Sequence, residues 1–342
     1  MKKNTSASEP TTNKTKEIFN WIDTGKGLSM LMVIFYHCEV SGVFNQARCA
    51  FVWFPFFMTF FFFMSGFLFH KGDENFDVKK KIKSIVTKLL WSYFVFTFII
   101  VAPKSLTHGT NILDGILGIF LGRASWFVAT LIVAELLLLP IFKYIKSSKK
   151  LFFISLVMMA ISLLVYDIIP SQPWHYNKGF SAAAYMIWGY LTYLNRNKLQ
   201  KFIKPITMVL LLVFYGVVRY LDYKYWGIKY SMPQDVSLSS IIFIFESVLG
   251  VSLMFVVCNL LPRISLLHSI GRNSLIYYYL NGGVVVVLTT LFLRFGFCGY
   301  GYVLLMFVLA TAILSFAAQI INKYCPFMVQ FPSKKHKILR KI

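Results

Sequence analysis

Long apolar runs alternate with short polar segments along the chain, a pattern typical of proteins that cross a membrane many times. A helix needs about 20 apolar residues to cross about 30 Å of hydrocarbon. The stretch 111–122 is too short to cross, and its Asp114 and three glycines predict an interfacial or re-entrant segment. Ten other runs are predicted to be helices, and they cover residues 27–44, 51–69, 84–102, 125–142, 151–168, 180–194, 204–221, 238–260, 273–293 and 301–321.

The composition supports an all-α polytopic membrane protein. Hydrophobic residues make up 57% of the 342 residues and charged residues 14%, whereas soluble proteins average about 45–50% apolar and about 25% charged residues. These values exclude a disordered chain, a collagen-like chain and an ordinary cytosolic enzyme. The five cysteines are scattered and form no CxxC pair, so neither a disulfide framework nor a metal site is predicted.

The charge is distributed unevenly between the predicted loops. The chain has 35 Lys and Arg residues against 13 Asp and Glu, a net charge of +22. With the N-terminus inside and ten crossings, 27 of these cations fall on the inner side and 8 on the other. Because cytoplasmic loops are enriched in Lys and Arg, both termini are predicted to be cytoplasmic. The same clustering argues for anchoring in a lipid bilayer, here the inner (plasma) membrane, and against nucleic acid as a partner.

No soluble domain is predicted beside the membrane helices. The longest polar stretches are too short to hold a core of their own. We therefore divide the chain into a polar basic cytoplasmic tail (1–26), a transmembrane domain (27–321) and a second basic cytoplasmic tail (322–342). Polar residues 1–17 do not have the form of a cleavable signal peptide. The function is expected to lie among the helices.

The first helix, in the segment 21–42, carries the most informative polar residues. Asp23 and Lys26 are three residues apart and can pair on one face. Lys26 and His37 are eleven apart, so they share a face at a distance of about 16 Å along the axis. Met30 and Val33 lie between them. An ionisable residue such as His37 near mid-membrane is costly and suggests a functional site, although a neutral histidine bonded to a neighbouring helix remains an alternative.

Other polar residues inside apolar runs are candidates for a substrate cavity. Ser65 interrupts the aromatic run 60–69, where its neighbour Gly66 favours close helix packing. Trp126 is expected at the outer interface. Buried acidic residues are expensive in lipid and are expected to face the bundle interior, where they orient His37 or pair with a buried cation. Glu135 and Glu246 are two such residues, and the neutral Asn281 is the last cavity candidate.

Two further features have two interpretations each. The lysines of the segment 79–83, Lys80 and Lys83 among them, anchor the chain at lipid headgroups or form a rim that binds the phosphates of an anionic donor. The three tyrosines at 277–279 either pack between helices or form a platform for a sugar.

These motifs together resemble the membrane-bound acyltransferase-3 family, the O-acetyltransferases of sugars and polysaccharides, including fucose 4-O-acetylase-like proteins. The resemblance covers most of the chain. It is carried by the opening ID-x-x-KG with His37 following it, by FFFFMSGFLF, by the basic stretch that leads into LLWSYF, by SWFVATLIVAELL and by GRNSLIYY.

The resemblance implies an enzyme of ten helices that takes acetyl-CoA from the cytoplasm and acetylates a carbohydrate. His37 matches the essential histidine of the family, as a general base or as a covalent acyl carrier. Lys26 stands where many members have arginine, so bidentate recognition of a phosphate or carboxylate is lost while the charge is kept. Asn281 stands where a second histidine is often found. Some members also carry an extracytoplasmic hydrolase-like domain, which is not expected here.

The acceptor implied by the resemblance is a cell-surface polysaccharide or its lipid-linked precursor. The main alternative from another class is a transporter or exporter of a small solute or lipid-linked glycan, built around Glu135, Glu246 and His37. A purely structural scaffold is disfavoured by the cost of burying so many ionisable groups. The sequence leaves open whether the protein forms a homo-oligomer.

Overall fold

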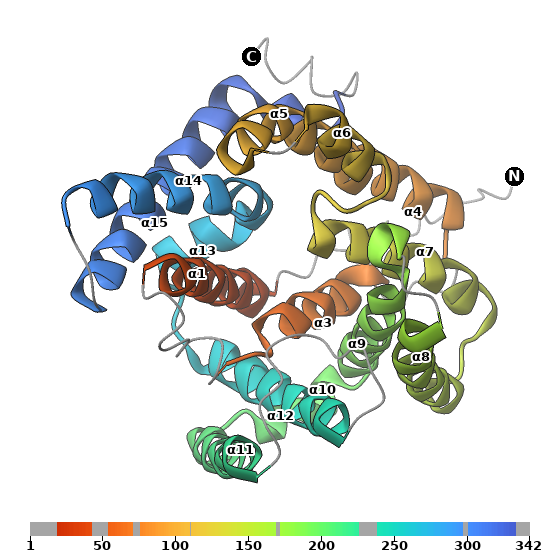
Figure 1. Ribbon diagram of the computed structural model, residues 1–342. Helices are drawn as coiled ribbons and strands as arrows, with labels where there is room; N and C mark the ends of the chain where they lie inside the picture. Colours follow the sequence, from red (N-terminus) through yellow and green to blue (C-terminus); the bar gives the residue numbers. More distant parts are fainter. Residues whose placement is uncertain are drawn as a thin grey trace, which may run out of the picture.

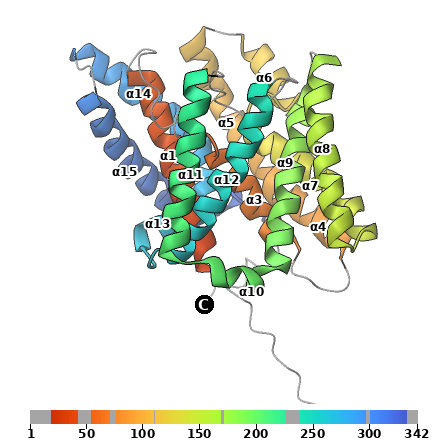
Figure 2. The same cartoon turned by 90° about the horizontal axis from the view of Figure 1, so that it is seen from below.

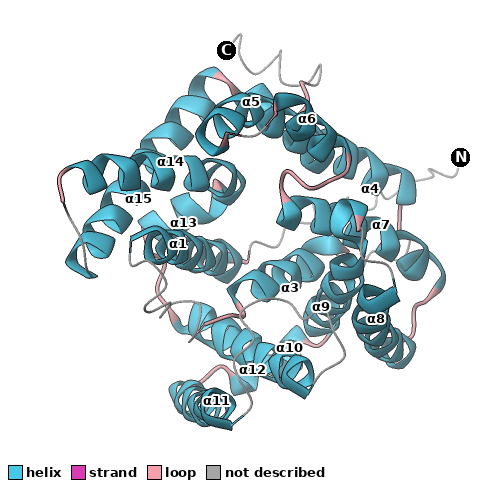
Figure 3. Cartoon of the chain, viewed as in Figure 1, coloured by secondary structure: helices cyan, strands magenta, loops and turns pink. Residues whose placement is uncertain are grey.

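The computed structural model describes residues 19–42, 54–70, 76–109, 111–168, 172–225, 238–296 and 300–332, and these residues form helices and short connections without a strand (Figure 3). Ten of the helices have 13 residues or more: α1 (Asn20–Gly42), α3 (Phe57–Phe69), α5 (Trp91–His108), α7 (Trp126–Tyr144), α8 (Ser148–Ile168), α9 (Tyr176–Leu194), α11 (Pro205–Tyr225), α12 (Leu238–Leu260), α14 (Ser274–Arg294) and α15 (Tyr300–Tyr324).

Shorter elements connect these helices or extend them: α4 (Val78–Ser84), a π-helical turn (Ile85–Leu90), α6 (Ile112–Phe120), α10 (Arg196–Leu199), α13 (Ser265–Arg272) and three 3₁₀ turns (Pro173–His175, Gln200–Phe202 and Pro326–Met328). The π-helical turn joins α4 to α5 without a break, so one long helix runs from residue 78 to residue 108 and begins earlier than expected.

Seven helical segments are long and apolar enough to cross a membrane, and α3 is a shorter apolar helix. The protein is therefore a multi-pass membrane protein. The number of crossings and the side on which each terminus lies stay predictions.

The long helices run side by side in one bundle (Figure 2). Helix α1 packs against α13, α14 and α15 and also against α3 and α12, so it lies inside the bundle (Figure 1). The helix begins at Asn20, seven residues before the expected boundary at residue 27, which makes Asp23 and Lys26 part of the helix rather than of a tail. We call the end of the bundle that holds α4, α10 and α13 the basic end (Figure 2).

The second predicted span, 51–69, is wrong in length. Helix α3 has 13 residues, or about 20 Å, because the chain turns at Pro55 and Phe56 before the helix starts. Eleven of the 13 residues are buried. A helix this short needs neighbouring helices rather than lipid around it, and α1, α7, α9 and α12 lie beside it in Figure 1.

Glycines set the closest helix contacts. A Cβ on Gly66 would collide with the backbone of Met186 in α9, and one on Gly189 would collide with the backbone of Phe63 in α3. Each helix therefore presents a glycine to the backbone of the other. The packing interpretation of Gly66 is confirmed.

The stretch 111–122 forms a short helix, as expected of a segment that does not cross. Helix α6 has nine residues and packs against α5, with Leu113 and Leu117 exposed. At the other end of the chain, residues beyond α15 return to the bundle. The Trp91 indole donates a hydrogen bond to Phe327 O at 2.6 Å, and Phe331 N donates to Thr87 O at 2.8 Å. Part of the expected tail 322–342 is thus packed on the long helix 78–108.

Candidate active site

Two glycine contacts fix the rotation of α1 against α13. A Cβ on Gly27 would collide with the backbone of Leu267, and one on Gly271 would collide with the backbone of Asp23. Because both contacts involve backbone atoms, α1 has little freedom to rotate. Its remaining faces are therefore presented to defined neighbours.

The face of α1 that carries Lys26 and His37 differs from its surroundings. Met30 and Val33, which lie between them, are only 1% and 4% exposed, so this face is directed into the protein. Lys26 and His37 are partly exposed, and no described residue forms a hydrogen bond or ion pair with either side chain. The alternative of a neutral histidine bonded to a neighbouring helix does not hold for the described residues.

The positions of these two residues along α1 also differ. Lys26 is the seventh and His37 the eighteenth of the 23 helical residues. Lys26 therefore lies toward the basic end, whereas His37 lies in the opposite half of α1. The separation of about 16 Å along the axis follows from the helical rise.

Asp23 does not pair with Lys26 as expected. Its carboxylate lies 3.5 Å from Nε of Arg272 at the end of α13. The reason is the close approach of α13 to the first turn of α1, which brings a guanidinium beside Asp23. The pair is partly exposed, and such pairs contribute little stability.

Ser65 and Trp126 keep polar groups available. Both are partly exposed, and neither the Ser65 hydroxyl nor the Trp126 indole N–H forms a hydrogen bond with a described residue. Trp126 is the first residue of α7, and Nζ of Lys178 lies 5.2 Å from its ring centroid. The ring thus contacts α9 rather than serving only as an interface anchor.

Glu135 forms an ion pair with a lysine of the basic segment. Nζ of Lys81 lies 3.2 Å from Oε2 of Glu135 and 3.8 Å from the centroid of the Phe69 ring. Lys81 is therefore the lysine of this segment that turns into the protein. Lys80 and Lys83 are exposed on α4, where they remain accessible to an anion.

Glu246 belongs to a second buried cluster, between α11 and α12. Its Oε2 lies 2.6 Å from Nη1 of Arg219, which also contacts Oδ2 of Asp222 at 3.1 Å. All three side chains are at most 2% exposed. Arg219, one of the eight cations that the charge count places on the outer side, is buried inside the protein. The pairing interpretation of both glutamates is confirmed.

Asn281 and the three tyrosines are largely occupied by packing. Asn281 Nδ2 donates to Tyr278 O in the same helix, while its Oδ1 is buried without a described partner. Tyr277 OH lies 2.7 Å from Ser315 Oγ, and the Tyr279 ring stacks on Phe96 at 4.6 Å. Tyr278 OH accepts a hydrogen bond from Phe127 N and lies 3.3 Å from Ser125 Oγ. Tyr278 therefore holds the start of α7.

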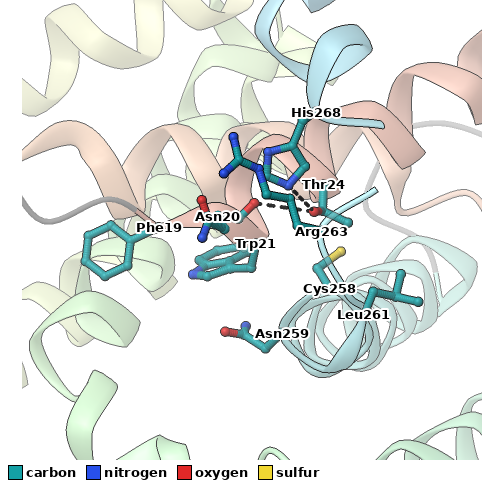
Figure 4. Close-up of a pocket in the computed structure, with 9 residues that line it drawn as sticks. All are labelled: Phe19, Asn20, Trp21, Thr24, Cys258, Asn259, Leu261, Arg263 and His268. Carbon is teal, nitrogen blue, oxygen red and sulfur yellow. Dashed lines mark hydrogen bonds between the residues drawn. The ribbon is translucent and has the colours of Figure 1, made fainter. Parts of the chain in front are cut away.

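A cavity of about 370 Å³ opens beside the first turn of α1, lined by Phe19, Asn20, Trp21, Thr24, Cys258, Asn259, Leu261, Arg263 and His268 (Figure 4). Thr24 Oγ1 lies 3.1 Å from His268 Nε2. Residues two apart on a helix point about 200° from each other, so Thr24 and Lys26 are on opposite faces. This cavity is separate from the face that carries His37.

The predicted residues thus fall into two groups. Lys26, His37, Ser65 and Trp126 have accessible polar groups without described partners, which is the state expected of residues that await a substrate. Asp23, Glu135 and Glu246 are held in ion pairs, and Asn281 is buried. Sequence reasoning missed Lys81 and Arg219 as the partners of the glutamates, although Arg219 and Asp222, three residues apart in an apolar run, were a usable signal.

A family model described as an acyltransferase domain, Acyl_transf_3, matches residues 19–321 of the chain. Neither a curated protein nor a solved structure matches the chain. The matched region includes every long helix apart from the last three residues of α15.

Proposed function

Since the chain belongs to the acyltransferase-3 family, we propose that this membrane acyltransferase moves an acetyl group from cytoplasmic acetyl-CoA to a hydroxyl group of a carbohydrate. The acceptor is a cell-surface polysaccharide or its lipid-linked precursor, with fucose as one sugar that the finer resemblance suggests. The reaction takes place in the inner (plasma) membrane, with both termini of the enzyme in the cytoplasm.

One observation carries this proposal. Lys26 and His37 share an inward face of α1, and no described side chain forms a hydrogen bond or ion pair with either of them. Ionisable side chains among membrane helices are costly unless they are paired, so these two accessible groups without a described partner are better explained by a substrate that completes them.

We assign the proton transfer to His37. The imidazole removes the proton from the sugar hydroxyl as its oxygen attacks the thioester carbonyl, because the ordinary pKa of histidine lies near neutrality. The C–O bond forms, the C–S bond breaks, and the proton passes to the CoA thiolate. In the alternative route His37 first carries the acetyl group itself and then releases it to the sugar.

Lys26 and the lysines of α4 supply positive charge for the donor. CoA carries phosphates, and an ammonium binds phosphate as a point charge. Lys26 lies on the half of α1 nearer the basic end, and Lys80 and Lys83 are exposed on α4. The nucleotide would remain at the basic end while the thioester reaches toward His37.

The test compares purified variants for acetyl transfer from acetyl-CoA. His37→Ala should lose transfer about 10²–10⁴-fold, the usual contribution of a general base, while the protein still inserts and folds. His37→Gln keeps the hydrogen bonding and bulk but accepts no proton, so it should be nearly as inactive. His70→Gln serves as the control, because the His70 ring lies against Phe76 and Tyr190 at the end of α3.

Activity close to wild type in both His37 variants would refute the catalytic assignment. Rescue by glutamine alone would mean that His37 positions or packs rather than transferring a proton. A purified protein that moves a solute without consuming acetyl-CoA would favour the transporter alternative. That alternative is weakened because Glu135 and Glu246 are engaged with Lys81 and Arg219.

A further inference from the structure

The chain has an unusual backbone conformation just before α9. Trp174 and His175 have φ angles of 58° and 50°, in the left-handed region that favours glycine. Such angles are unfavourable for bulky residues and persist only where the surroundings impose them. Here Trp174 N donates to Leu121 O at 2.7 Å, and the Trp174 indole donates to Phe120 O at 3.1 Å. These bonds hold the 3₁₀ turn Pro173–His175 against the connection between α6 and α7.

This conformation places His175 beside two cations. Burial, together with the smaller effect of the charges of Lys178 and Arg123, lowers the pKa of His175 to about 4. The ring is therefore neutral at pH 7 and offers one N–H. Its Nε2 is buried and has no hydrogen-bond partner among the described residues.

Lys178 is one turn further along the chain, next to Trp126. Its Nζ lies 5.2 Å from the centroid of the Trp126 ring, and no described carboxylate forms an ion pair with it. Trp126 opens α7, whose N-terminus carries the positive end of the helix dipole. Positive charge thus collects where α7 and α9 begin, next to an accessible aromatic ring.

The cluster has the character of a binding site for a negatively charged sugar. The Lys178 ammonium forms no ion pair with a described carboxylate, and a buried nitrogen without a described partner, such as His175 Nε2, is unfavourable. An anionic group would relieve both costs through charge-assisted hydrogen bonds. The flat Trp126 ring would suit the apolar face of a sugar, because small-molecule sites combine aromatic surface with a few placed polar groups.

We propose that the acyl acceptor carries a carboxylate or phosphate that binds Lys178 and the His175 ring, while its sugar lies against Trp126. This inference rests on the proposed function and adds the charge of the acceptor to it.

The test uses the purified enzyme, acetyl-CoA and the surface polysaccharide from cells that lack this gene. The polysaccharide is supplied untreated, after chemical reduction of its carboxyl groups, and after removal of its phosphates. For the wild type, one of the two treatments should raise the KM for the polysaccharide about tenfold or more, which also identifies the anionic group. The KM for acetyl-CoA should not change.

The Lys178→Met variant should show the same rise in KM on the untreated polysaccharide and little further change on the neutralised one. Lys178→Arg should keep most of the wild-type preference for the charged polysaccharide over the neutralised one. Lys224→Met is the control, because Lys224 is exposed at the end of α11 beside Tyr225. The inference would be overturned if the treated and untreated polysaccharides had equal KM values, or if the polysaccharide proved to be uncharged. It would also be overturned if Lys178→Met raised the KM equally for both forms. An enzyme that acetylates none of them would overturn the proposed function and this inference with it.

Discussion

At the scale of single residues, burial and pairing separate structural charges from candidate functional ones. Arg219 is fully buried, and its guanidinium is paired with two carboxylates. Lys26 and His37 have no such partners among the described residues. Charged groups in a membrane interior are costly unless paired. Our proposal therefore assigns the chemistry to the residues without a described partner, not to the most deeply buried ones.

The Arg219 cluster gives a prediction on stability. Arg219→Met should destabilise the protein strongly, by about 3–5 kcal/mol, because it leaves Asp222 and Glu246 buried without their cation. Glu246→Gln should cost less, since Arg219 keeps Asp222. Thermal unfolding of the detergent-solubilised protein measures both effects. Arg294→Met, at the exposed end of α14, is the control, and a melting temperature for Arg219→Met equal to that of the control would contradict the prediction.

At the scale of elements, glycines decide how closely helices approach. Gly66 and Gly189 join α3 to α9, while Gly27 and Gly271 join α1 to α13. These contacts matter for the candidate site because they orient the helices that carry Ser65 and His37. A short buried helix such as α3 has few other means of fixing its position.

Gly66→Ala should therefore separate α3 from α9 and lower both stability and activity. The added Cβ would meet the backbone of Met186, which cannot rotate away as a side chain can. Gly216→Ala in α11 is a matched control, which should raise the stability instead of lowering it. No atom lies within 4 Å of a Cβ there, and alanine in a helix gains about 0.5–1 kcal/mol over glycine. Melting temperatures that rise in both variants would contradict the packing role of Gly66.

At the scale of the whole molecule, the long helices and the basic end agree with an enzyme that takes its donor from one side of a membrane. Lysines of α4 lie at the same end of the bundle as α10 and α13 (Figure 2), and the cations of the sequence divide 27 to 8 under a ten-helix topology. The second cationic cluster, at Lys178 and Arg123, lies where α7 and α9 begin. Donor and acceptor would then approach His37 from different directions.

The topology itself is testable with reporter fusions. A reporter after residue 342 should lie in the cytoplasm, and a reporter inserted within residues 226–237 should lie outside, because the cation bias orients the chain. The measurement uses two reporters, one active only in the cytoplasm and the other active only outside it, each fused at both positions. Fusions at both positions that report the same side would refute the ten-crossing arrangement.

The sequence by itself determined the helices and the shared face of Lys26 and His37. Both depend on local geometry, since helical hydrogen bonds join residues four apart and the helical period places positions 26, 30, 33 and 37 on one side. Apolar runs therefore located most helices to within a few residues. There were three exceptions. Helix α1 starts seven residues earlier than expected. The turn at Pro55 shortens α3, and α4 extends the helix that contains α5 toward the N-terminus.

Only the tertiary structure decided which charges pair and which remain available. Glu135 could meet Lys81, and Asp23 could meet Arg272, only after helices distant in sequence had been rotated into contact. For α1 and α13, that rotation is set by the backbone contacts at Gly27 and Gly271. It does not follow from hydrophobic periodicity, which specifies that a face is buried but not which neighbour covers it.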